Sequence, residues 1–355
     1  MINNRNLPDS PKDGAATVYR RFVMSKVSER TREAYADDLR DFAGFLGVEP
    51  AGDQHPLEAL PDGAWRELDT AHVAAYLEHL KTAVSDHTGR PYSTATIARR
   101  MTAVRELLTE ATYLGLFPRN RLEYLKERLS TPEVTHEHHS GITPEDQARL
   151  LETADAQPGL KGLRDYSLFR LWLDTGLRRA ELAALKVRDL VVKEGTPTLV
   201  VRKGKGGRVR EIGLESYTDH VVWDWLRQSG QADDPGGPVF CQVRKLGRGD
   251  EAEYQVVDPE EHLSGVALWK LVKWYREAAG IESDITPHSF RVAMVTDSLD
   301  GGAPIQHVQA AGGWTSTRMI TAVYDRNRYA DPVARYRRTP LPRRTASDGN
   351  IELGL

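Results

Sequence analysis

The 355-residue sequence holds a single cysteine, Cys241. A disulfide within the chain needs two cysteines, so a disulfide framework is excluded and the composition fits a reducing cytoplasm. Cys241 directly follows Val239 and Phe240, and cysteine is among the residue types most often buried. We therefore expect Cys241 to be a buried strand residue rather than a catalytic thiol.

Long apolar runs are also missing. No run approaches the ~18–20 residues that are needed to span a bilayer. Residues 1–13 are polar and lack the apolar segment of a signal peptide. With 40% hydrophobic and 28% charged residues, the chain is expected to be soluble and folded, and its length favours two domains.

An overall excess of basic residues is missing too, since the net charge is −3. This argues against simple nucleic-acid binding, because phosphates are neutralised by clustered Lys and Arg. The charge is segregated, however. Acids dominate residues 33–78, bases dominate residues 81–128, and residues 202–210 hold five bases and no acid. Segregated charge of this kind can form one basic face on a nearly neutral protein.

Helical periodicity is the main pattern in the first part of the chain. Apolar residues at helical spacing predict helices over residues 31–46, 69–81, 93–114 and 119–129. The stretch between Gly47 and Asp69 is rich in Gly, Pro and acids and predicts a connection. Residues 130–141 have no apolar periodicity and predict a domain boundary. We interpret the histidines at 136, 138 and 139 as part of a solvated linker rather than a metal site.

The second part mixes helices with a short hairpin. Thr143 and Pro144 begin a helix in the expected way, with a cap, a proline in the first turn and acids after it. Residues 198–201 and 209–212 predict two strands joined by a glycine-rich turn. Further helices are predicted over residues 163–175, 179–185, 217–228, 264–279 and 289–299. The tail from Pro340 is rich in Pro, Arg and polar residues and is expected to be disordered.

The second part also holds side chains that suit metal-free phosphoryl transfer. The transition state spreads negative charge over nonbridging oxygens, so guanidinium groups and N–H donors must surround the phosphate. A nucleophile and a proton donor for the leaving oxygen complete the set.

The first candidate is Arg178, which lies where one predicted helix ends at a Thr-Gly pair and another begins. Glu181 follows three residues later on the same helical face and can orient a charged neighbour. Taken alone, the two residues are more simply read as a surface ion pair.

His288 and Arg291 are spaced i, i+3 at the start of a predicted helix, a position that favours anions. Trp314, in a Gly-Gly-Trp sequence, supplies an indole N–H that cannot lose its proton. Tyr324 closes a late Thr-x-x-Tyr sequence. Each of these is ordinary alone, and a lone Tyr at helical spacing is usually a core residue.

The ordered combination resembles a known family. Thr-Gly-Leu-Arg-x-x-Glu-Leu, a Gly-Lys-Gly hairpin, His-x-x-Arg, Gly-Trp and a late Thr-x-x-Tyr are similar to the motifs of tyrosine recombinases, or phage integrases. Ser28, Thr31, Tyr35, Leu39 and Phe42 resemble that family's core-binding domain. The hairpin is similar to Xer-type proteins, and the stretch after Ser229 and the Ala-Gly-Gly-Trp-Thr sequence are similar to Cre recombinase. The resemblance covers roughly residues 15–335.

This resemblance implies a mainly α fold with a small antiparallel β-sheet, in two domains. Residues 15–130 would form a helical, SAM-like core-binding domain, and residues 143–338 a mixed α/β catalytic domain. Residues 131–142 would link them, and residues 339–355 would form a disordered tail.

The resemblance also implies a site-specific recombinase that needs neither metal nor ATP, hence no cofactor. The implied catalytic residues are Arg178, Glu181, Lys205, His288, Arg291, Trp314 and Tyr324. Arg178 and Arg291 would clamp the scissile phosphate, and His288 and Trp314 would donate further hydrogen bonds.

Three residues complete the implied reaction. Tyr324 would attack to give a 3′-phosphotyrosyl intermediate, Lys205 would protonate the 5′-hydroxyl leaving group, and Glu181 would brace the site. The interval from Trp314 to Tyr324 is one residue longer than is usual in the family, so Tyr329 is a second candidate nucleophile.

The expected partner is double-stranded DNA that carries an inverted-repeat recombination site. Candidate DNA-binding residues are Arg99, Arg100, Arg105, Arg202, Lys203, Arg208, Lys270 and Lys273. The resemblance implies a monomer in solution and a homotetramer on DNA, with a dimer at each site and a C-terminal helix inserted into each neighbour. Tyr329, Val333 and Tyr336 could supply that helix. We also expect accessory DNA-bending proteins and no membrane partner. The protein is expected in the cytoplasm, with the nucleoid, and to be encoded by a bacterium, a phage or a plasmid.

Three alternatives remain at this point. A type IB topoisomerase would use the same nicking chemistry with a different outcome. A non-catalytic DNA-binding protein could descend from a recombinase, and a helical protein-interaction module would leave the Lys205 hairpin and the late Tyr324 unexplained.

Overall fold

The computed structural model divides the chain into two compact units, residues 1–137 and 138–355. Each unit has a hydrophobic core of its own. The structure describes residues 14–26, 28–50, 52–58, 60–86, 88–133, 141–202, 209–247, 253–318 and 320–321. In this part of the chain, no helix combines the length and the apolar composition that crossing a bilayer requires.

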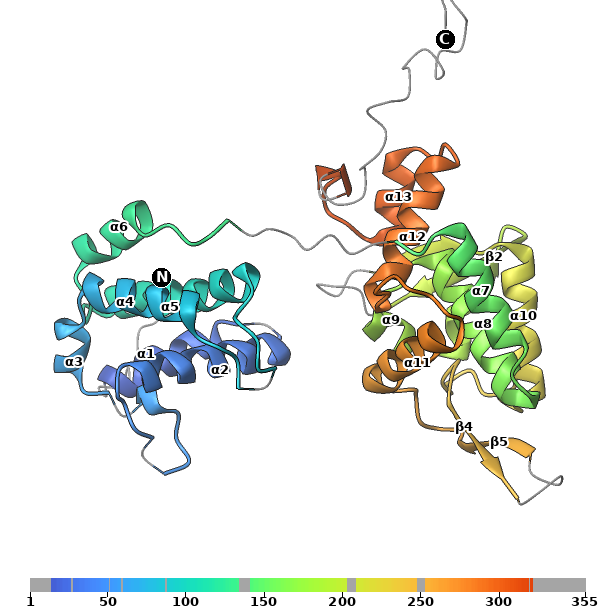
Figure 1. The fold of residues 1–355 in the computed structure, drawn as a ribbon, viewed down its shortest axis with the longest axis horizontal. Coiled ribbons are helices and arrows are strands. Elements are labelled where there is room, and N and C mark those ends of the chain that lie inside the picture. Colours follow the sequence, from blue (N-terminus) through green and yellow to red (C-terminus); the bar gives the residue numbers. More distant parts are fainter. Residues whose placement is uncertain are drawn as a thin grey trace, which may run out of the picture. The chain divides into compact units, whose positions relative to one another are not determined.

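The first unit is helical in its described residues (Figure 1). Its α-helices are α1 (Gly14–Met24), α2 (Glu29–Phe45), α3 (Asp62–Glu67), α4 (Thr70–Thr82), α5 (Thr94–Tyr113) and α6 (Arg119–Arg128). The apolar stripes that predicted α2, α4 and α5 face the core, where Leu39, Tyr76 and Met101 are fully buried. Ser93 caps α5, because its side chain accepts a hydrogen bond from the backbone N–H of Thr96 at 3.2 Å.

The prediction of a plain connection between Gly47 and Asp69 is wrong. This stretch contains a short 3₁₀ helix, Pro56–Glu58, and the helix α3. Both are shorter than the window over which helical periodicity can be recognised. They are held by burial instead, since Leu57 and Trp65 are each 1% exposed. Helix α1, which begins at Gly14, was not predicted either.

The second unit combines helices with a three-stranded sheet and a separate two-stranded hairpin, which projects from the helices (Figure 1). Its α-helices are α7 (Pro144–Asp155), α8 (Gly159–Thr175), α9 (Arg179–Ala183), α10 (Ser216–Gln228), α11 (Gly265–Ala278), α12 (Pro287–Asp300) and α13 (Ile305–Gly312). Helix α8 is central, because it packs against α7, α10 and α12. Its Trp172 and Phe169 stack on Phe290 of α12, with ring centroids 4.4 and 5.6 Å away.

The three-stranded sheet is antiparallel in the order β1 (Leu190–Lys193), β2 (Thr196–Val201) and β3 (Arg210–Gly213). Strands β2 and β3 were predicted, whereas β1 was not. Glu194 and Gly195 join β1 to β2 with φ angles of 49° and 78°, and positive φ at both positions suits a tight hairpin turn. Pairing of Val201 with Arg210 closes the foot of the loop between β2 and β3.

The remaining strands, β4 (Gln242–Leu246) and β5 (Glu253–Asp258), pair antiparallel and were not predicted. Cys241 lies just before β4 and is fully buried, as expected, although it is outside the strand itself. Burial raises the pKa of its thiol to about 11, so the thiol is protonated near neutral pH. This agrees with a structural rather than a nucleophilic cysteine.

Candidate active site

The junction between α8 and α9 places Arg178. Helix α8 ends at Thr175, and its C-cap Gly176 has a φ of 56° and lies so close to Met294 that an added Cβ would be 2.6 Å from the Met294 Cε. The buried indole of Trp172 donates a hydrogen bond to the carbonyl of Leu177 at 2.7 Å. Arg178 then occupies the N-cap of α9. A glycine is required at this turn, and the packed indole fixes the direction in which the chain leaves it.

Glu181 holds Arg178 in place. The Nη1 of Arg178 donates to the Oε1 of Glu181 at 2.8 Å, and the backbone N–H of Arg178 donates to Oε2 at 2.9 Å. The Glu181 side chain is 3% exposed, and that of Arg178 is 30% exposed. Arg178 is therefore fixed on one side while part of its side chain still reaches the surface.

A second arginine, Arg210, binds the same carboxylate from β3. Its Nη1 and Nη2 donate to the two oxygens of Glu181 at 2.9 and 2.7 Å. Burial alone would raise the pKa of Glu181, but the hydrogen bonds from Arg210 and Arg178 outweigh it and lower the pKa below its ordinary value. In the sequence, Arg210 stands out only as one base of the basic stretch 202–210. No local pattern could have paired it with Glu181, 29 residues away.

Helix α12 supplies His288 and Arg291. Thr286 caps this helix and accepts a hydrogen bond from the backbone N–H of His288 at 3.3 Å. His288 lies half-buried in the first turn, whereas Arg291 is 2% exposed. Arg291 Nη1 donates to the carbonyl of Gly176 at 2.9 Å, and Nη2 donates to the carbonyl of Gly312. Its guanidinium group thus joins the segment before Arg178 to the end of α13.

Trp314 covers this guanidinium group. The central carbon of the Arg291 guanidinium group lies 3.7 Å from the centroid of the Trp314 ring, within the range of a cation–π contact. Gln309 fixes the Trp314 backbone, since its carbonyl accepts from the Trp314 N–H and its side chain donates to the Trp314 carbonyl, each at 3.1 Å. A Cβ added at Gly312 would lie 1.6 Å from the ring. The glycine therefore makes room for the tryptophan.

The structure thus brings together several of the predicted catalytic residues through their contacts. Arg178 pairs with Glu181, Arg291 stacks on Trp314, and the two pairs are connected through Gly176 and Arg210. His288 lies one turn before Arg291 on α12. Lys205, Tyr324 and the alternative Tyr329 lie outside the described residues. The catalytic roles of all seven residues stay predictions.

The candidate DNA-binding residues of the first unit form ion pairs with α2. Arg99 and Arg100 of α5 both pair with the buried Asp38, and Arg100 also pairs with Asp41. The Arg99 side chain is 46% exposed and that of Arg100 only 14%. Arg105 donates to the carbonyl of Leu129. Much of the basic charge of these candidates is therefore balanced within the unit, and Arg99 is the more exposed of the two ion-paired candidates.

The candidate DNA-binding residues of the second unit also differ in exposure and in their pairing with other side chains. Arg202 is half-exposed and donates to Asp189 at 2.7 Å. Lys270 and Lys273 lie on the exposed face of α11, where the nitrogen of Lys273 is 5.8 Å from the centroid of the exposed Trp269 ring. Lys203 and Arg208 lie outside the described residues.

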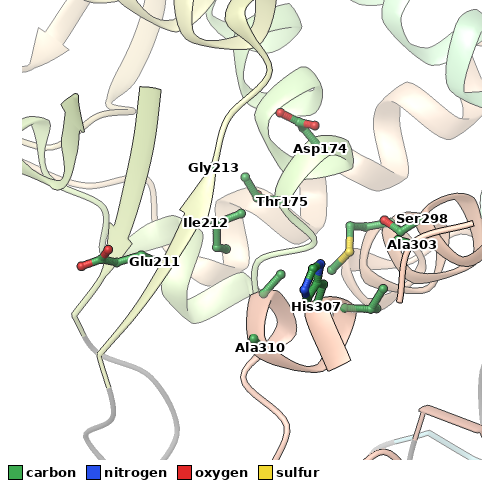
Figure 2. A pocket seen from close by; sticks show the side chains of 12 residues that line it. Asp174, Thr175, Glu211, Ile212, Gly213, Ser298, Ala303, His307 and Ala310 are labelled. Atoms are coloured by element: carbon green, nitrogen blue, oxygen red, sulfur yellow. The ribbon is translucent and has the colours of Figure 1, made fainter. Parts of the chain in front are cut away.

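A cleft of about 400 Å³ opens beside the site. Its lining comes from β3, the end of α8, α12 and α13, and includes Asp174, Ile212, Met294 and Val308. Figure 2 shows Ile212 of β3 and His307 of α13 across the hollow from each other. Burial raises the pKa of the Asp174 carboxyl on its rim. Among the described residues, no group of three or more His, Cys, Asp or Glu is placed to hold a metal ion.

Two family models match the chain. Residues 141–331, more than half of the chain, match the phage integrase family, and residues 21–113 match its N-terminal SAM-like domain. A tyrosine recombinase of Synechococcus elongatus is 31% identical over 79% of this chain and 80% of its own length. The tyrosine recombinase XerC of Roseiflexus castenholzii is 28% identical over 82% of this chain and 81% of its own.

Solved structures show the same fold. A lambda integrase dimer bound to a core site superposes with a TM-score of 0.60 at 17% identity, covering 89% of this chain and 79% of that one. The Tn1549 transposon integrase in complex with transposon right-end DNA gives a TM-score of 0.61 at 14% identity, covering 89% and 96%.

The expected fold class, mainly α with small antiparallel sheets in two domains, is confirmed. The comparisons favour neither a topoisomerase nor a non-catalytic binding protein. The chain belongs to the phage integrase family and is a tyrosine site-specific recombinase.

Proposed function

We propose that this recombinase binds duplex DNA at a site with inverted repeats and exchanges strands through a 3′-phosphotyrosyl intermediate on Tyr324, without metal or ATP. The meeting of three distant segments carries the proposal. The turn before Arg178, the helix with His288 and Arg291, and the Gly-Gly-Trp segment are joined by the two hydrogen bonds of Arg291. The side chains on these segments are arginine, histidine and tryptophan. Their N–H groups are the kind of donor that stabilises the negative charge in the transition state of phosphoryl transfer.

Arg178 and Arg291 act as the phosphate clamp in this proposal. Both guanidinium groups are fixed by protein partners before DNA arrives: Arg178 by Glu181, and Arg291 by two carbonyls and the Trp314 ring. Groups that are already oriented need little reorganisation when charge develops on the phosphate. His288, in the first turn of α12, adds a donor at a helix N-terminus, where anions are favoured.

The reaction needs no outside reagent. The Tyr324 oxygen attacks the phosphorus and releases its proton to water, the bond from phosphorus to the 5′-oxygen breaks, and Lys205 gives a proton to that oxygen. The 5′-hydroxyl of the partner strand then gives its proton to Lys205 and attacks the phosphotyrosine, and Tyr324 leaves and takes a proton back from water. One phosphodiester bond is lost and one is made. Lys205 belongs to the connection between β2 and β3, which follows the pair formed by Val201 and Arg210.

Duplex binding is assigned to both units. Lys270 and Lys273 share an exposed helical face with Trp269, and no acid occurs between Gly265 and Arg276. Such a face suits phosphates and the apolar edge of a groove. In the first unit, Arg99 is the candidate best placed to reach DNA because its side chain is 46% exposed.

Assembly on DNA is proposed as a homotetramer, with a dimer at each site. The C-terminal segment around Tyr329, Val333 and Tyr336 would leave one protomer and enter its neighbour. The cleft lined by Ile212, Met294 and Val308 offers an apolar acceptor for it. DNA-bending accessory proteins and a location with the nucleoid in the cytoplasm belong to the same proposal.

Covalent trapping tests the proposal. DNA bound by the protein is selected from a random pool, aligned for inverted repeats, and rebuilt with a nick beside the cleavage point, so that the released strand diffuses away. The wild-type protein should form a covalent 3′ adduct in the presence of EDTA. Arg178→Ala and Arg291→Ala should bind the DNA but form the adduct roughly 100–1000-fold more slowly. Specific binding without an adduct from the wild type would refute the proposed reaction.

A further inference from the structure

We infer that Arg210 is a positioning residue of this active site, which holds Glu181, and through it Arg178, in register with the segment that carries Trp314. The inference rests on the proposed function, because it assigns a role within the same reaction. It concerns a residue that neither the motifs nor the sequence resemblance singled out.

Three nitrogens of Arg210 have protein partners. Nη1 and Nη2 bind the two oxygens of Glu181, and Nε donates to the carbonyl of Ala311 at 2.7 Å. The Arg210 side chain is only 9% exposed. The carboxylate of Glu181 balances the charge of Arg210, whereas the hydrogen-bond acceptors of Arg291 are neutral carbonyls. Arg210 is therefore expected to position Glu181 rather than to contact the phosphate.

These bonds connect three separate elements. Glu181 belongs to α9, Arg210 begins β3, and Ala311 lies in the last turn of α13. Arg291 binds the neighbouring carbonyl, that of Gly312. Arg210 and Arg291 therefore fasten adjacent peptide units of α13, and each reaches back to the segment around Arg178. A shift of Arg210 would move Arg178 relative to Trp314.

The glycine after this pair of carbonyls fits the same role. Gly313 has a φ of 67°, and an added Cβ would lie 3.0 Å from the Cδ of Arg210 and 3.3 Å from its Nε. Gly312 makes room for Trp314, and Gly313 makes room for Arg210. The two adjacent glycines thus leave space for the Trp314 ring, which stacks on Arg291, and for the Arg210 side chain, which binds Glu181.

Arg210 also lowers the pKa of Glu181. The charged groups that act on Glu181 are Arg178, at the N-cap of α9, and Arg210 of β3. Helix α11 also packs on α9, but there the uncharged Gly265 lies beside Arg179. With Arg210 neutral, burial would raise the pKa of Glu181 and only Arg178 would oppose it. Geometry and charge can therefore be separated with two substitutions, since lysine keeps the charge but not the two-pronged hydrogen bonding.

The experiment compares Arg210→Lys and Arg210→Gln with the wild type. It measures three quantities: the single-turnover rate of adduct formation at saturating nicked DNA, the Kd for that DNA, and the rate as a function of pH. Arg170→Lys is the matched control, because Arg170 joins two elements of the same unit through Glu215 at 3.1 Å and Thr218 at 3.0 Å, neither of which is a predicted catalytic residue. Thermal unfolding shows whether each variant is folded.

Arg210→Lys should slow adduct formation about 100-fold, the cost of a misplacement of about 1 Å, with an unchanged Kd. In Arg210→Lys, the rate of adduct formation should fall at the same acidic pH as in the wild type. In Arg210→Gln, the rate should begin to fall at a higher pH. Arg170→Lys should match the wild type in all three quantities.

Other outcomes overturn the inference in recognisable ways. A wild-type rate in Arg210→Lys shows that the geometry of the fork is irrelevant. A raised Kd in both variants makes Arg210 a DNA contact, and a loss of rate that only follows unfolding makes it a structural residue. If the wild type itself forms no adduct on DNA that it binds specifically, the proposed function fails and the inference fails with it.

Discussion

The guanidinium carbon of Arg291 lies over the Trp314 ring, 3.7 Å from its centroid, while Nη1 and Nη2 donate to the carbonyls of Gly176 and Gly312. A buried arginine on α12 is therefore oriented by a ring and by two turns that are distant in sequence. The contact gives Trp314 two separable contributions, a ring that holds Arg291 and an N–H that can donate to a phosphate.

Trp314→Phe and Trp314→Ala separate these contributions. Phenylalanine keeps a ring over Arg291 but has no N–H, so adduct formation should slow roughly 100–1000-fold, as for the loss of one transition-state donor. Trp314→Ala removes the ring as well, so its adduct formation should be slower again. The loss of the cation–π contact should add about 0.5–2 kcal/mol to the activation free energy. Single-turnover rates on nicked DNA measure both. Equal rates for the wild type and Trp314→Phe would exclude N–H donation.

Gly312→Ala tests the space beneath the same ring. The new Cβ would lie 1.6 Å from Trp314, so the ring must move away from Arg291. We expect a loss of about 1–3 kcal/mol in the free energy of unfolding from overpacking, together with slower adduct formation. Gly44→Ala is the control, since nothing lies within 4 Å of its added Cβ and alanine favours the helix. Wild-type rates in Gly312→Ala would show that the position of Trp314 is not important.

Glu181→Gln tests the carboxylate that the two arginines share. Removing the charge leaves Arg210, with a side chain 9% exposed, without its buried counter-ion. The free energy of unfolding should fall by about 3–5 kcal/mol near neutral pH, measured by denaturant titration. A change below about 1 kcal/mol would mean that the pair contributes no more than a surface ion pair.

The pH dependence of this loss has a definite sign. The folded pKa of Glu181 is lowered, so its stabilising contribution is fully present above the ordinary carboxyl pKa of about 4.3 and is lost as the pH falls through the lower, folded value. The difference between wild type and Glu181→Gln should therefore be constant from pH 7 to about 5 and shrink below about 4. A difference that grows on acidification would contradict the direction of the shift.

Lys270 and Lys273 should contribute to DNA affinity through phosphates. If each neutralises one phosphate, each Lys→Ala change should reduce the slope of log K against log salt by about 0.9. Filter binding or fluorescence anisotropy at several salt concentrations gives the slope. Lys193→Ala, which removes an exposed lysine paired with Glu211, is the control and should leave the slope unchanged. An unchanged slope in the double α11 variant would remove this helix from the interface.

Local patterns predicted the parts of the fold that they control. The stripes of α4 and α5 extend over three turns or more, and the Arg178–Glu181 pair follows from helical spacing. Helix α13 was missed because it has eight residues, of which only Val308 and Gly312 are buried. Strand β1 carried a usable signal, the Glu194-Gly195 turn between two apolar runs, and was overlooked.

The missing part of the site is long-range. Arg210 meets Glu181 and Ala311 across separations of 29 and 101 residues, and no periodicity connects such positions. The sequence also predicted an Arg99/Arg100 face for DNA without showing that Asp38 and Asp41 of α2 pair with it. Charge counting along the chain cannot foresee which acids fold against which bases.

The most direct test of the account is to identify the residue that carries the DNA. Wild type, Tyr324→Phe and Tyr329→Phe are incubated with the nicked target in EDTA, and the adduct is digested and located by mass spectrometry. We expect a 3′-phosphate joined to Tyr324 in the wild type and in Tyr329→Phe, and no adduct in Tyr324→Phe. An adduct that persists in Tyr324→Phe and maps to Tyr329 would contradict the assignment of the nucleophile.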